Sequence, residues 1–413
     1  MSILESTRFV TGINYWPRTK AMTWWKHFDA AEVNTDFALI SELGFEIVRI
    51  FLMWEDFQPD HFSVSRTALD KLETVCDLAV EHHLKLNITF FTGHMSAANW
   101  PPIWLLNGRP PLGHIRNVSS GTVVVSDYEN PYINSFVIEA QKRLLKVVIE
   151  KFSGHPAISL WNLGNEPDLF ARPLNDSNGE TWTREMVSHI KKIDQKHPVT
   201  LGLHYGDLAE NTGLRADLCL AACDISVMHA YPMYSNGIAR HPLDPDFVPF
   251  TCALTSALSG RPVLMEEFGG CTTSPGRTSE TWQWQVDGSS RSQFMASEED
   301  LADYFRAVLP KLHRNGVLGA IIWCFADYAP HLWGTVPFDH ALHERFFGIV
   351  RPDGSLKAHA EVLRLFNSQN LTVQPIPAYA QLKIDPEMFY QAPQSQLKSL
   401  YQEYLARQPM DIT

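Results

Sequence analysis

Several classes of protein are excluded by what this 413-residue sequence lacks. Its six cysteines contain no Cys-x-x-Cys pair, so neither a zinc ribbon nor a thiol redox motif is expected. No segment reaches about 18 consecutive apolar residues, so no transmembrane helix is expected. The first residues, MSILESTR, have neither the basic start nor the apolar centre of a secretory signal. We therefore expect a soluble, cytoplasmic protein with reduced thiols.

An excess of positive charge is also missing. The chain has 34 Lys and Arg against 46 Asp and Glu, which gives a formal charge of −12. Nucleic acids and anionic membranes call for basic patches, so neither is expected as a partner. The 17 histidines include no His-Glu-x-x-His or similar spacing, so no metal site is predicted. Nothing in this composition argues against a neutral partner such as a sugar.

Short apolar runs alternate with helix-like segments along most of the chain, a pattern typical of a parallel sheet. The predicted strands lie at 9–14, 46–52, 84–91, within 158–167, 199–203, 224–229, within 262–270, and 317–323. The predicted helices lie at 33–43, 67–83, 131–152, 181–195, 250–258, 298–314 and 356–366. An open doubly wound sheet is the alternative, but no Gly-rich phosphate turn follows the first strand. The sequence thus predicts an α/β fold, a (β/α)8 TIM barrel with long loops after its strands.

The long loops and the end of the chain complete the predicted organisation. Residues 92–127, 270–297 and 324–347 are predicted as long irregular loops, which in a compact domain are usually functional. Residues 1–366 are predicted to form the catalytic barrel. Residues 367–413 are polar and contain several Gln and Pro. We expect them to form a C-terminal extension that packs on the barrel or is partly mobile.

Two strand-like stretches end in a carboxylate. Ile158 begins an apolar run that closes with Asn165-Glu166-Pro167, and Pro262 begins another that closes with Glu266-Glu267-Phe-Gly-Gly. Side chains at the carboxyl ends of barrel strands line the active site of a TIM barrel. A retaining glycosidase needs two carboxyl groups across one site, one acid/base and one nucleophile. The two stretches are typical of that chemistry.

These two motifs resemble the catalytic signatures of glycoside hydrolase clan A, and of family 5 within it. The resemblance runs from about residue 10 to about residue 366. It implies that Glu166 is the general acid/base, that Glu267 is the nucleophile, and that Asn165 binds the sugar 2-hydroxyl. Glu266 is the rival nucleophile, but in the family the nucleophile directly precedes an aromatic–Gly step. Adjacent strand residues point to opposite faces, so we expect Glu266 to face the other side of the strand, paired with a basic group or water.

The resemblance extends to residues at the ends of other predicted strands. Arg49 matches the family's strand-2 arginine and is expected to pair with Glu267 and keep it ionised; the alternative is a salt bridge elsewhere. His229 and Tyr231 match its His-x-Tyr, in which the tyrosine hydroxyl holds the nucleophile. Trp323 matches the tryptophan that forms the floor of the sugar site, although a core tryptophan is the alternative.

Two further histidines, His94 and His204, follow predicted strands. Each is either a site residue or a loop histidine satisfied by local hydrogen bonds, and His94 is included among the predicted substrate-binding residues. Many of the remaining tryptophans fall in loops, where they either form sugar platforms or pin the loops.

The predicted reaction is hydrolysis of a β-glycoside by double displacement, with neither metal nor organic cofactor. The predicted partner is an oligosaccharide substrate. The three long predicted loops would enclose the site, which favours an exo-acting β-mannosidase on short manno-oligosaccharides. A β-glucosidase, an endo-acting mannanase or glucanase, a transglycosylase, and a sugar-binding barrel without catalysis are the alternatives. Oligomeric state is not readable from the sequence. The predicted double displacement requires the carboxyl groups of Glu166 and Glu267 to lie about 5 to 5.5 Å apart.

Overall fold

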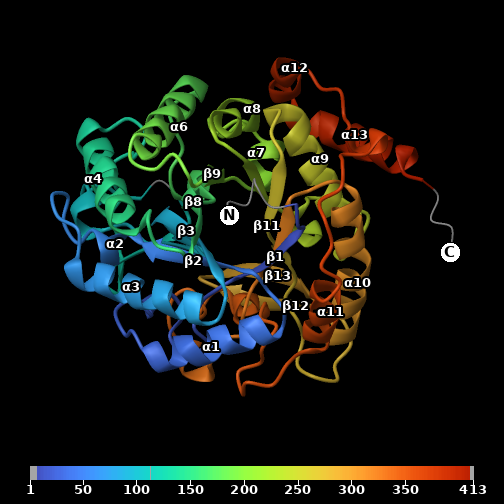
Figure 1. Cartoon of the computed structure of the whole chain (residues 1–413), viewed down its shortest axis with the longest axis horizontal. Coiled ribbons are helices and arrows are strands. Elements are labelled where there is room, and N and C mark those ends of the chain that lie inside the picture. The colour runs from blue at the N-terminus through green and yellow to red at the C-terminus, as the bar shows by residue number, and fades with distance from the viewer. Residues whose placement is uncertain (1–6, 112, 410–413) are drawn as a thin grey trace.

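The centre of the fold is a barrel of eight parallel strands (Figure 1). The computed structural model describes residues 7–111 and 113–409. The barrel strands are β1 (Val10–Asn14), β2 (Ile47–Met53), β3 (Lys85–Thr92), β8 (Ile158–Asn165), β9 (Val199–Gly202), β10 (Ser226–His229), β11 (Val263–Gly269) and β14 (Gly319–Trp323).

Hydrogen bonding follows the order β10-β11-β14-β1-β2-β3-β8-β9, and all pairs in this sheet are parallel. The first and last strands of that order also approach each other. A parallel bridge joins His204 to His229, and the amide of His229 donates to the carbonyl of Leu203 at 3.0 Å. The sheet is therefore a nearly closed barrel, and the predicted (β/α)8 fold is confirmed.

Helices on the outside connect the strands (Figure 1). The longer ones are α1 (Ala30–Glu42), α3 (Arg66–Glu81), α4 (Ser135–Phe152), α6 (Asp176–Lys191), α9 (Phe247–Ser259), α10 (Glu298–Arg314) and α11 (Ala358–Asn367). Short helices α2 (Trp54–Phe57), α5 (Pro167–Phe170) and α7 (Tyr205–Ala209) follow strand ends, and α8 (Ala216–Cys219) lies between α7 and β10. Asp29, Ser65, Asn134 and Ser297 cap α1, α3, α4 and α10 by accepting hydrogen bonds from backbone amides of the first turn.

Two apolar layers hold the barrel together. Inside it lies a compact group of buried aliphatic side chains: Val10, Ile47, Leu160, Ile225, Val227, Leu264 and Ile321. A much larger core fills the space between the strands and the surrounding helices. This interior packing leaves the carboxyl ends of the strands as the place where polar side chains gather.

Two of the predicted irregular loops contain regular structure. The loop after β3 forms a small sheet from β4 (His94–Met95), β5 (Ala98–Asn99), β6 (Arg116–Ser119) and β7 (Thr122–Val124). The loop after β11 forms an antiparallel hairpin, β12 (Glu280–Val286) and β13 (Ser289–Met295).

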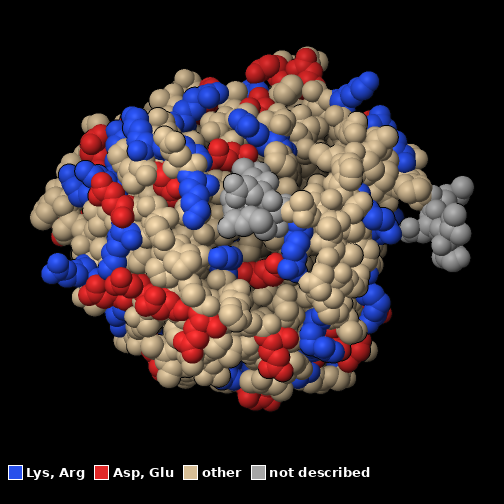
Figure 2. Space-filling view, viewed as in Figure 1, with Lys and Arg blue, Asp and Glu red and all other residues tan. Residues whose placement is uncertain are grey.

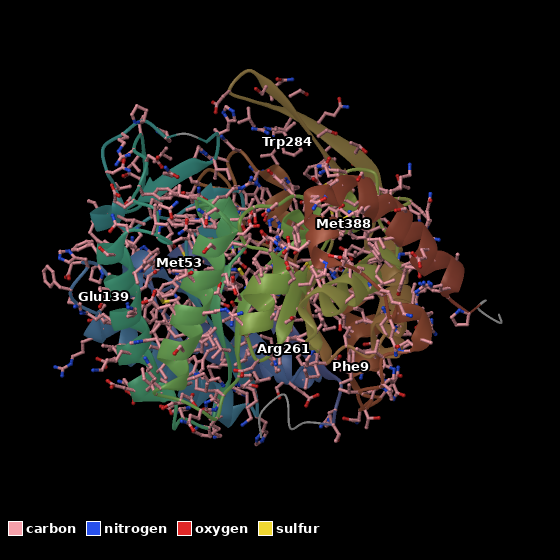
Figure 3. All side chains as sticks on the ribbon, turned by 90° about the horizontal axis from the view of Figure 1, so that it is seen from above. Phe9, Met53, Glu139, Arg261, Trp284 and Met388 are labelled. Atoms are coloured by element: carbon pink, nitrogen blue, oxygen red, sulfur yellow. The ribbon has the colours of Figure 1, made fainter. Side chains whose placement is uncertain are left out.

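The hairpin projects from one end of the molecule at Trp284, while Phe9 and Arg261, which precede β1 and β11, lie towards the opposite end (Figure 3). It therefore extends from the end of the barrel that carries the site. Irregular loops were the wrong prediction here. The sequence signal for a strand was the alternation along β12 of polar residues with Trp282, Trp284 and Val286.

The C-terminal residues add two helices, α12 (Pro386–Gln391) and α13 (Pro393–Arg407). Tyr401 of α13 packs against Phe250 of α9, with ring centroids 5.0 Å apart, and its hydroxyl donates to Asp244 at 2.7 Å. The described part of this segment thus packs on the barrel. The proposed division of the chain at residue 366 stays a prediction.

Acidic and basic side chains are interspersed on the face seen in Figure 2, and acidic ones gather over α1 and α3. Within residues 7–111 and 113–409, no helix is long and apolar enough to cross a bilayer.

Candidate active site

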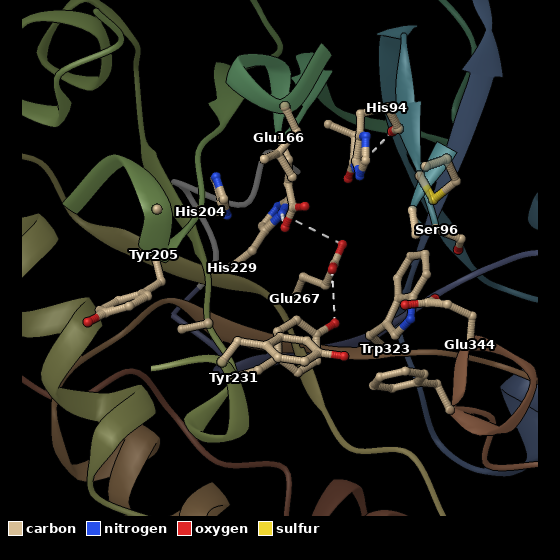
Figure 4. A pocket seen from close by; sticks show the side chains of 18 of the residues that line it. His94, Ser96, Glu166, His204, Tyr205, His229, Tyr231, Glu267, Trp323 and Glu344 are labelled. Atoms are coloured by element: carbon tan, nitrogen blue, oxygen red, sulfur yellow. Dashed lines mark hydrogen bonds and ion pairs between the residues drawn. The ribbon is translucent and has the colours of Figure 1, made fainter. Parts of the chain in front are cut away.

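A cavity of about 390 Å3 opens at the carboxyl ends of the barrel strands (Figure 4). Seven of the eight residues selected from the sequence line it: His94, Asn165, Glu166, His229, Tyr231, Glu267 and Trp323. The eighth, Arg49, is completely buried and contacts Glu267 and Asn165. The fold thus brings together side chains from six different strands or the loops that follow them.

Glu166 directly follows β8. Its backbone has φ 43°, a left-handed conformation that is uncommon for a residue with a side chain. Such conformations persist where the surroundings enforce them, and they cluster at functional sites. Pro167 begins α5 immediately afterwards, and the Glu166 amide donates to the carbonyl of Gly202 at 2.9 Å. This turn places the carboxyl group of Glu166 in the cavity.

Glu267 reaches the same cavity from β11. One of its carboxylate oxygens lies within 4.8 Å of one from Glu166. This separation suits the spacing of about 5 to 5.5 Å between the carboxyl groups of a retaining glycosidase. The Tyr231 hydroxyl donates to Glu267 Oε1 at 2.9 Å, and Arg49 Nη1 donates to Oε2 at 3.1 Å. Two fixed donors therefore orient the carboxylate of Glu267, and the contact expected between it and Arg49 is present.

Glu266 does not face the other side of its strand, so that prediction is wrong. Strand β11 is irregular after Met265: the register shifts against both β10 and β14 at this point. An extra residue in a strand changes the side to which its side chains point. Both Glu266 and Glu267 consequently face the barrel interior, where Glu266 is fully buried.

Buried donors surround the carboxylate of Glu266. Asn87 donates to it at 2.6 Å and Asn162 at 2.7 Å, while Arg49 Nη2 lies 3.4 Å away. Burial opposes its ionisation, but Arg49, His229 and Asn87 outweigh that effect and lower the pKa of Glu266. Glu266 is therefore an ionised group directly beneath the cavity floor, and the basic partner expected for it is Arg49.

Arg49 connects these groups. Besides its contacts with the two glutamates, it donates to Asn165 Oδ1 at 3.0 Å and to Thr89 Oγ1 at 3.0 Å. The Asn165 amide nitrogen donates to the His94 carbonyl at 3.3 Å. A side-chain amide nitrogen carries two hydrogens. Within residues 7–111 and 113–409 the second hydrogen of Asn165 has no acceptor, so it can be donated to a ligand, as the predicted role requires.

His229 lies between three carboxylates. Its Nε2 is 3.0 Å from Glu266, and its Nδ1 is 3.2 Å from Glu166 and 3.6 Å from Glu267. Burial alone would lower the pKa of an imidazole, but the carboxylates, Glu267 foremost, outweigh it and raise the pKa of His229. An ionised carboxylate only accepts hydrogen bonds, so the protonated imidazole suits both ring nitrogens.

Glu166 and Glu267 compete for one proton. Burial raises the pKa of Glu267 to about 7 against the charges of His229 and Arg49. Burial also opposes ionisation of Glu166, but the charges of His204 and His229 outweigh it and lower its pKa to about 2. This order places the shared proton on Glu267 only while both histidines are charged. Direct donation from Arg49 and Tyr231 to the carboxylate oxygens of Glu267 stabilises its ionised form and favours the opposite order.

The direct hydrogen bonds from Arg49 and Tyr231 keep Glu267 ionised. Arg49 and His229 then balance the charges of Glu266 and Glu267, which leaves Glu166 to carry the shared proton.

Of the other predicted residues, His94 is held by Asn99, whose Oδ1 lies 2.8 Å from its Nδ1, and burial lowers its pKa. It is therefore both locally satisfied and part of the cavity wall. Trp323 ends β14 and is 6 % exposed. Its face is available to the cavity, which suits a sugar platform as well as a core position.

Some cavity residues were not selected from the sequence. His204, which had been left between two interpretations, lines the cavity, and its Nε2 is 3.0 Å from Asp168. Burial lowers the pKa of His204, but Asp168 and Glu166 outweigh it and raise that pKa well above its usual value. His343 and Glu344 come from the loop after β14 and had no local sequence signal.

Two groups have the atoms to hold a metal ion: Glu166, His229 and Glu267, and Asp168, His204 and Asp207. In each, the candidate ligand atoms lie within 4.8 Å of one another. In the first, the guanidinium of Arg49 already supplies positive charge to Glu267. Both groups are accounted for by ion pairs among their own members and neighbours.

Comparison with known proteins identifies the family. A match to the family described as cellulase (glycosyl hydrolase family 5) covers residues 7–304. Mannan endo-1,4-beta-mannosidase A of Hypocrea jecorina is 24% identical over 305 residues, which is 62% of this chain and 62% of that protein. Mannan endo-1,4-beta-mannosidase 3 of Arabidopsis thaliana is 29% identical over 185 residues, 37% of this chain and 44% of that protein. The chain spans less than two thirds of the length of these curated relatives.

Solved structures share the fold. The exo-beta-1,4-mannosidase Op5Man5 from Opitutaceae bacterium strain TAV5 superposes with a TM-score of 0.71 at 24% identity, over 88% of this chain and 60% of that one. GH5_18 from Streptomyces cattleya in complex with GlcNAc superposes with a TM-score of 0.74 at 18% identity, over 96% of this chain and 90% of that one. The resemblance drawn from the two glutamate motifs is confirmed by the family match: this chain belongs to glycosyl hydrolase family 5.

Proposed function

We propose that this protein is a retaining β-glycosidase that releases mannose from the non-reducing end of short β-linked manno-oligosaccharides. The observation that carries the proposal is the pair of carboxyl groups, Glu166 and Glu267, within 4.8 Å across one cavity. Neither a metal nor an organic cofactor takes part in the proposed reaction.

The proposed mechanism assigns one step to each carboxyl group. Glu267, held by Arg49 and Tyr231, attacks the anomeric carbon while Glu166 donates its proton to the departing oxygen. A covalent glycosyl-enzyme forms and the first product leaves. Glu166 then removes a proton from water, which attacks the anomeric carbon and releases the sugar with its original configuration.

Three observations support mannose and exo action. The cavity, at about 390 Å3, is near the small end of the range for ligand pockets, and loop residues such as Glu344 and Phe347 wall it in. Op5Man5 is named an exo-beta-1,4-mannosidase. A Glu-to-Ala variant of GH5_18 from Streptomyces cattleya was solved in complex with Manb1-4GlcNAc.

The mechanism is tested with aryl β-mannoside, glucoside, galactoside and xyloside, and the anomer released is followed by NMR. We expect the mannoside to react fastest, with retention, and Glu267→Gln to lose at least about a thousandfold in kcat. Azide should rescue Glu267→Gly and give the α-glycosyl azide, because it replaces the nucleophile in a single inversion. It should rescue Glu166→Ala with the β-glycosyl azide. If Glu267→Gln keeps wild-type turnover while Glu266→Gln abolishes it, the nucleophile is assigned wrongly.

Endo action is the second candidate, favoured by the names of the curated relatives, which are mannan endo-1,4-beta-mannosidases. Mannotetraose separates the two. An exo-acting enzyme yields mannose and mannotriose at early times, whereas an endo-acting enzyme yields mannobiose. Early mannobiose without mannose would refute the exo proposal and leave the retaining mechanism in place.

A further inference from the structure

Glu344 is a carboxylate in the cavity wall that the proposed mechanism does not use. It lies in a short 3-10 helix, Leu342–Phe346, within the loop that follows β14. Its side chain is 14% exposed and lines the cavity together with that of the adjacent His343. Figure 4 shows its carboxylate end turned towards Trp323, inside the cavity.

The hydrogen-bonding capacity of Glu344 is largely unused. Among the residues that the structure describes, its carboxylate is paired with His343, whose Nε2 lies 3.4 Å from Oε1. That distance exceeds a normal hydrogen bond. A carboxylate has two oxygens and about four acceptor sites, and it cannot donate. A largely buried carboxylate with spare acceptor sites is costly unless a ligand supplies donors.

The position of Glu344 indicates which part of a sugar it meets. In the proposed reaction Glu166 protonates the departing oxygen, so the leaving group lies on the Glu166 side. In Figure 4, Glu344 lies on the far side of Glu267 and Trp323 from Glu166. The hydroxyls of a pyranose that lie away from C1 are those on carbons 3, 4 and 6.

We infer that Glu344 accepts hydrogen bonds from one or two of these hydroxyls and thereby selects a terminal sugar. In a residue inside a 1,4-linked chain, the oxygen on carbon 4 carries the next sugar and has no hydrogen to donate. A chain end keeps that hydroxyl. Glu344 thus gives a chemical basis for exo action, an inference that rests on the proposed glycosidase function.

The test is a cycle of variants and substrates. Wild type and Glu344→Gln are compared on the aryl β-glycoside that the panel selects and on its 3-deoxy, 4-deoxy and 6-deoxy analogues. Glu344→Ala is run in parallel, because glutamine can still accept one hydrogen bond. The matched control is Glu280→Gln on the neighbouring hairpin. The carboxylate of Glu280 accepts from Trp282 and lies outside the cavity lining. Circular dichroism and melting temperature verify folding.

With the parent glycoside, kcat/KM of the Glu344 variants should fall about ten- to a hundredfold, as for a lost hydrogen bond to a charged group. For at least one deoxy analogue, kcat/KM of wild type should fall by a similar factor relative to the parent glycoside. For the same analogue, kcat/KM of Glu344→Ala should stay almost equal to its value with the parent glycoside. The control should match wild type on every substrate.

The inference is overturned if each of the three analogues lowers kcat/KM by the same factor in wild type and in Glu344→Ala. Glu344 would then contact none of the missing hydroxyls. Wild type would still hydrolyse the parent glycoside in that case, and the proposed function would stand. If wild type hydrolyses no aryl β-glycoside, the function fails and this inference fails with it.

Discussion

Replacing Arg49 with methionine tests the buried charge cluster beneath the cavity. Arg49 is 0% exposed and lies 3.1 Å from Glu267 and 3.4 Å from Glu266. Methionine has a similar reach but no charge and no donors. Arg49→Met therefore leaves two adjacent buried carboxylates without the guanidinium that contacts both of them.

Removing one partner of a buried ion pair costs about 3–5 kcal/mol. For a chain of 413 residues, the entropy of unfolding at the melting temperature is about 0.9 kcal/mol per kelvin. We therefore expect Arg49→Met to lower the melting temperature by about 3–6 °C at pH 7. The loss should shrink at acidic pH, because protonation removes the carboxylate charges that Arg49 neutralises.

A second substitution separates charge from shape. Glu266→Gln in the Arg49→Met background removes one of the two unpaired charges, and its amide oxygen can still accept from Asn87 and Asn162. We expect the double variant to be more stable than Arg49→Met by about 1–3 kcal/mol, although each single change destabilises. Calorimetry of the four proteins at one scan rate measures this coupling.

The reasoning is refuted if the melting temperature of Arg49→Met lies within about 1 °C of wild type, which is the precision of the assay. It is also refuted if the stability losses from the two single changes simply add in the double variant. Either result would mean that Arg49 does not neutralise the carboxylates it contacts.

Three further predictions concern single groups. His204→Asn removes a positive charge near Glu166, so the pKa of Glu166 rises and the alkaline limb of the kcat/KM profile moves to higher pH; an unchanged profile would contradict this. Tyr231→Phe removes a donor to Glu267 and should lower kcat/KM about ten- to a hundredfold without a change in fold, measured with the aryl mannoside. Burial raises the pKa of Asp36 to about 7, above its value in the unfolded chain. The folded protein therefore loses stability as pH rises towards 7, because the unfolded chain releases this proton at a lower pH than the folded protein does. Asp36→Asn should remove that loss, with a gain of about 2–4 kcal/mol above pH 7 in urea titrations and little effect near pH 4.

Strand ends were the part of the site that the sequence could predict. Around Glu166 and Glu267, an apolar run stops at residues that cannot continue a strand, and this local pattern is independent of the rest of the fold. The carboxyl ends of parallel strands meet at one end of a barrel, so the residues after them could be placed in one site before any coordinates existed.

The orientation of Glu266 could not be predicted in the same way. Two neighbouring residues of a regular strand face opposite sides, and the sequence gives no sign of the irregularity after Met265. That irregularity arises from the pairing of β11 with β10 on one side and β14 on the other. It is a property of three strands together.

The sequence by itself determined the eight-stranded barrel, the family, and the two glutamates at one end, because periodicity and strand-breaking residues are local signals. Only the tertiary structure decided that Glu266 and Arg49 form a buried charge pair under the cavity and that Glu344 reaches the cavity from a distant loop. Those contacts depend on strand register and loop packing, which join residues far apart in the chain and leave no pattern in the sequence around them.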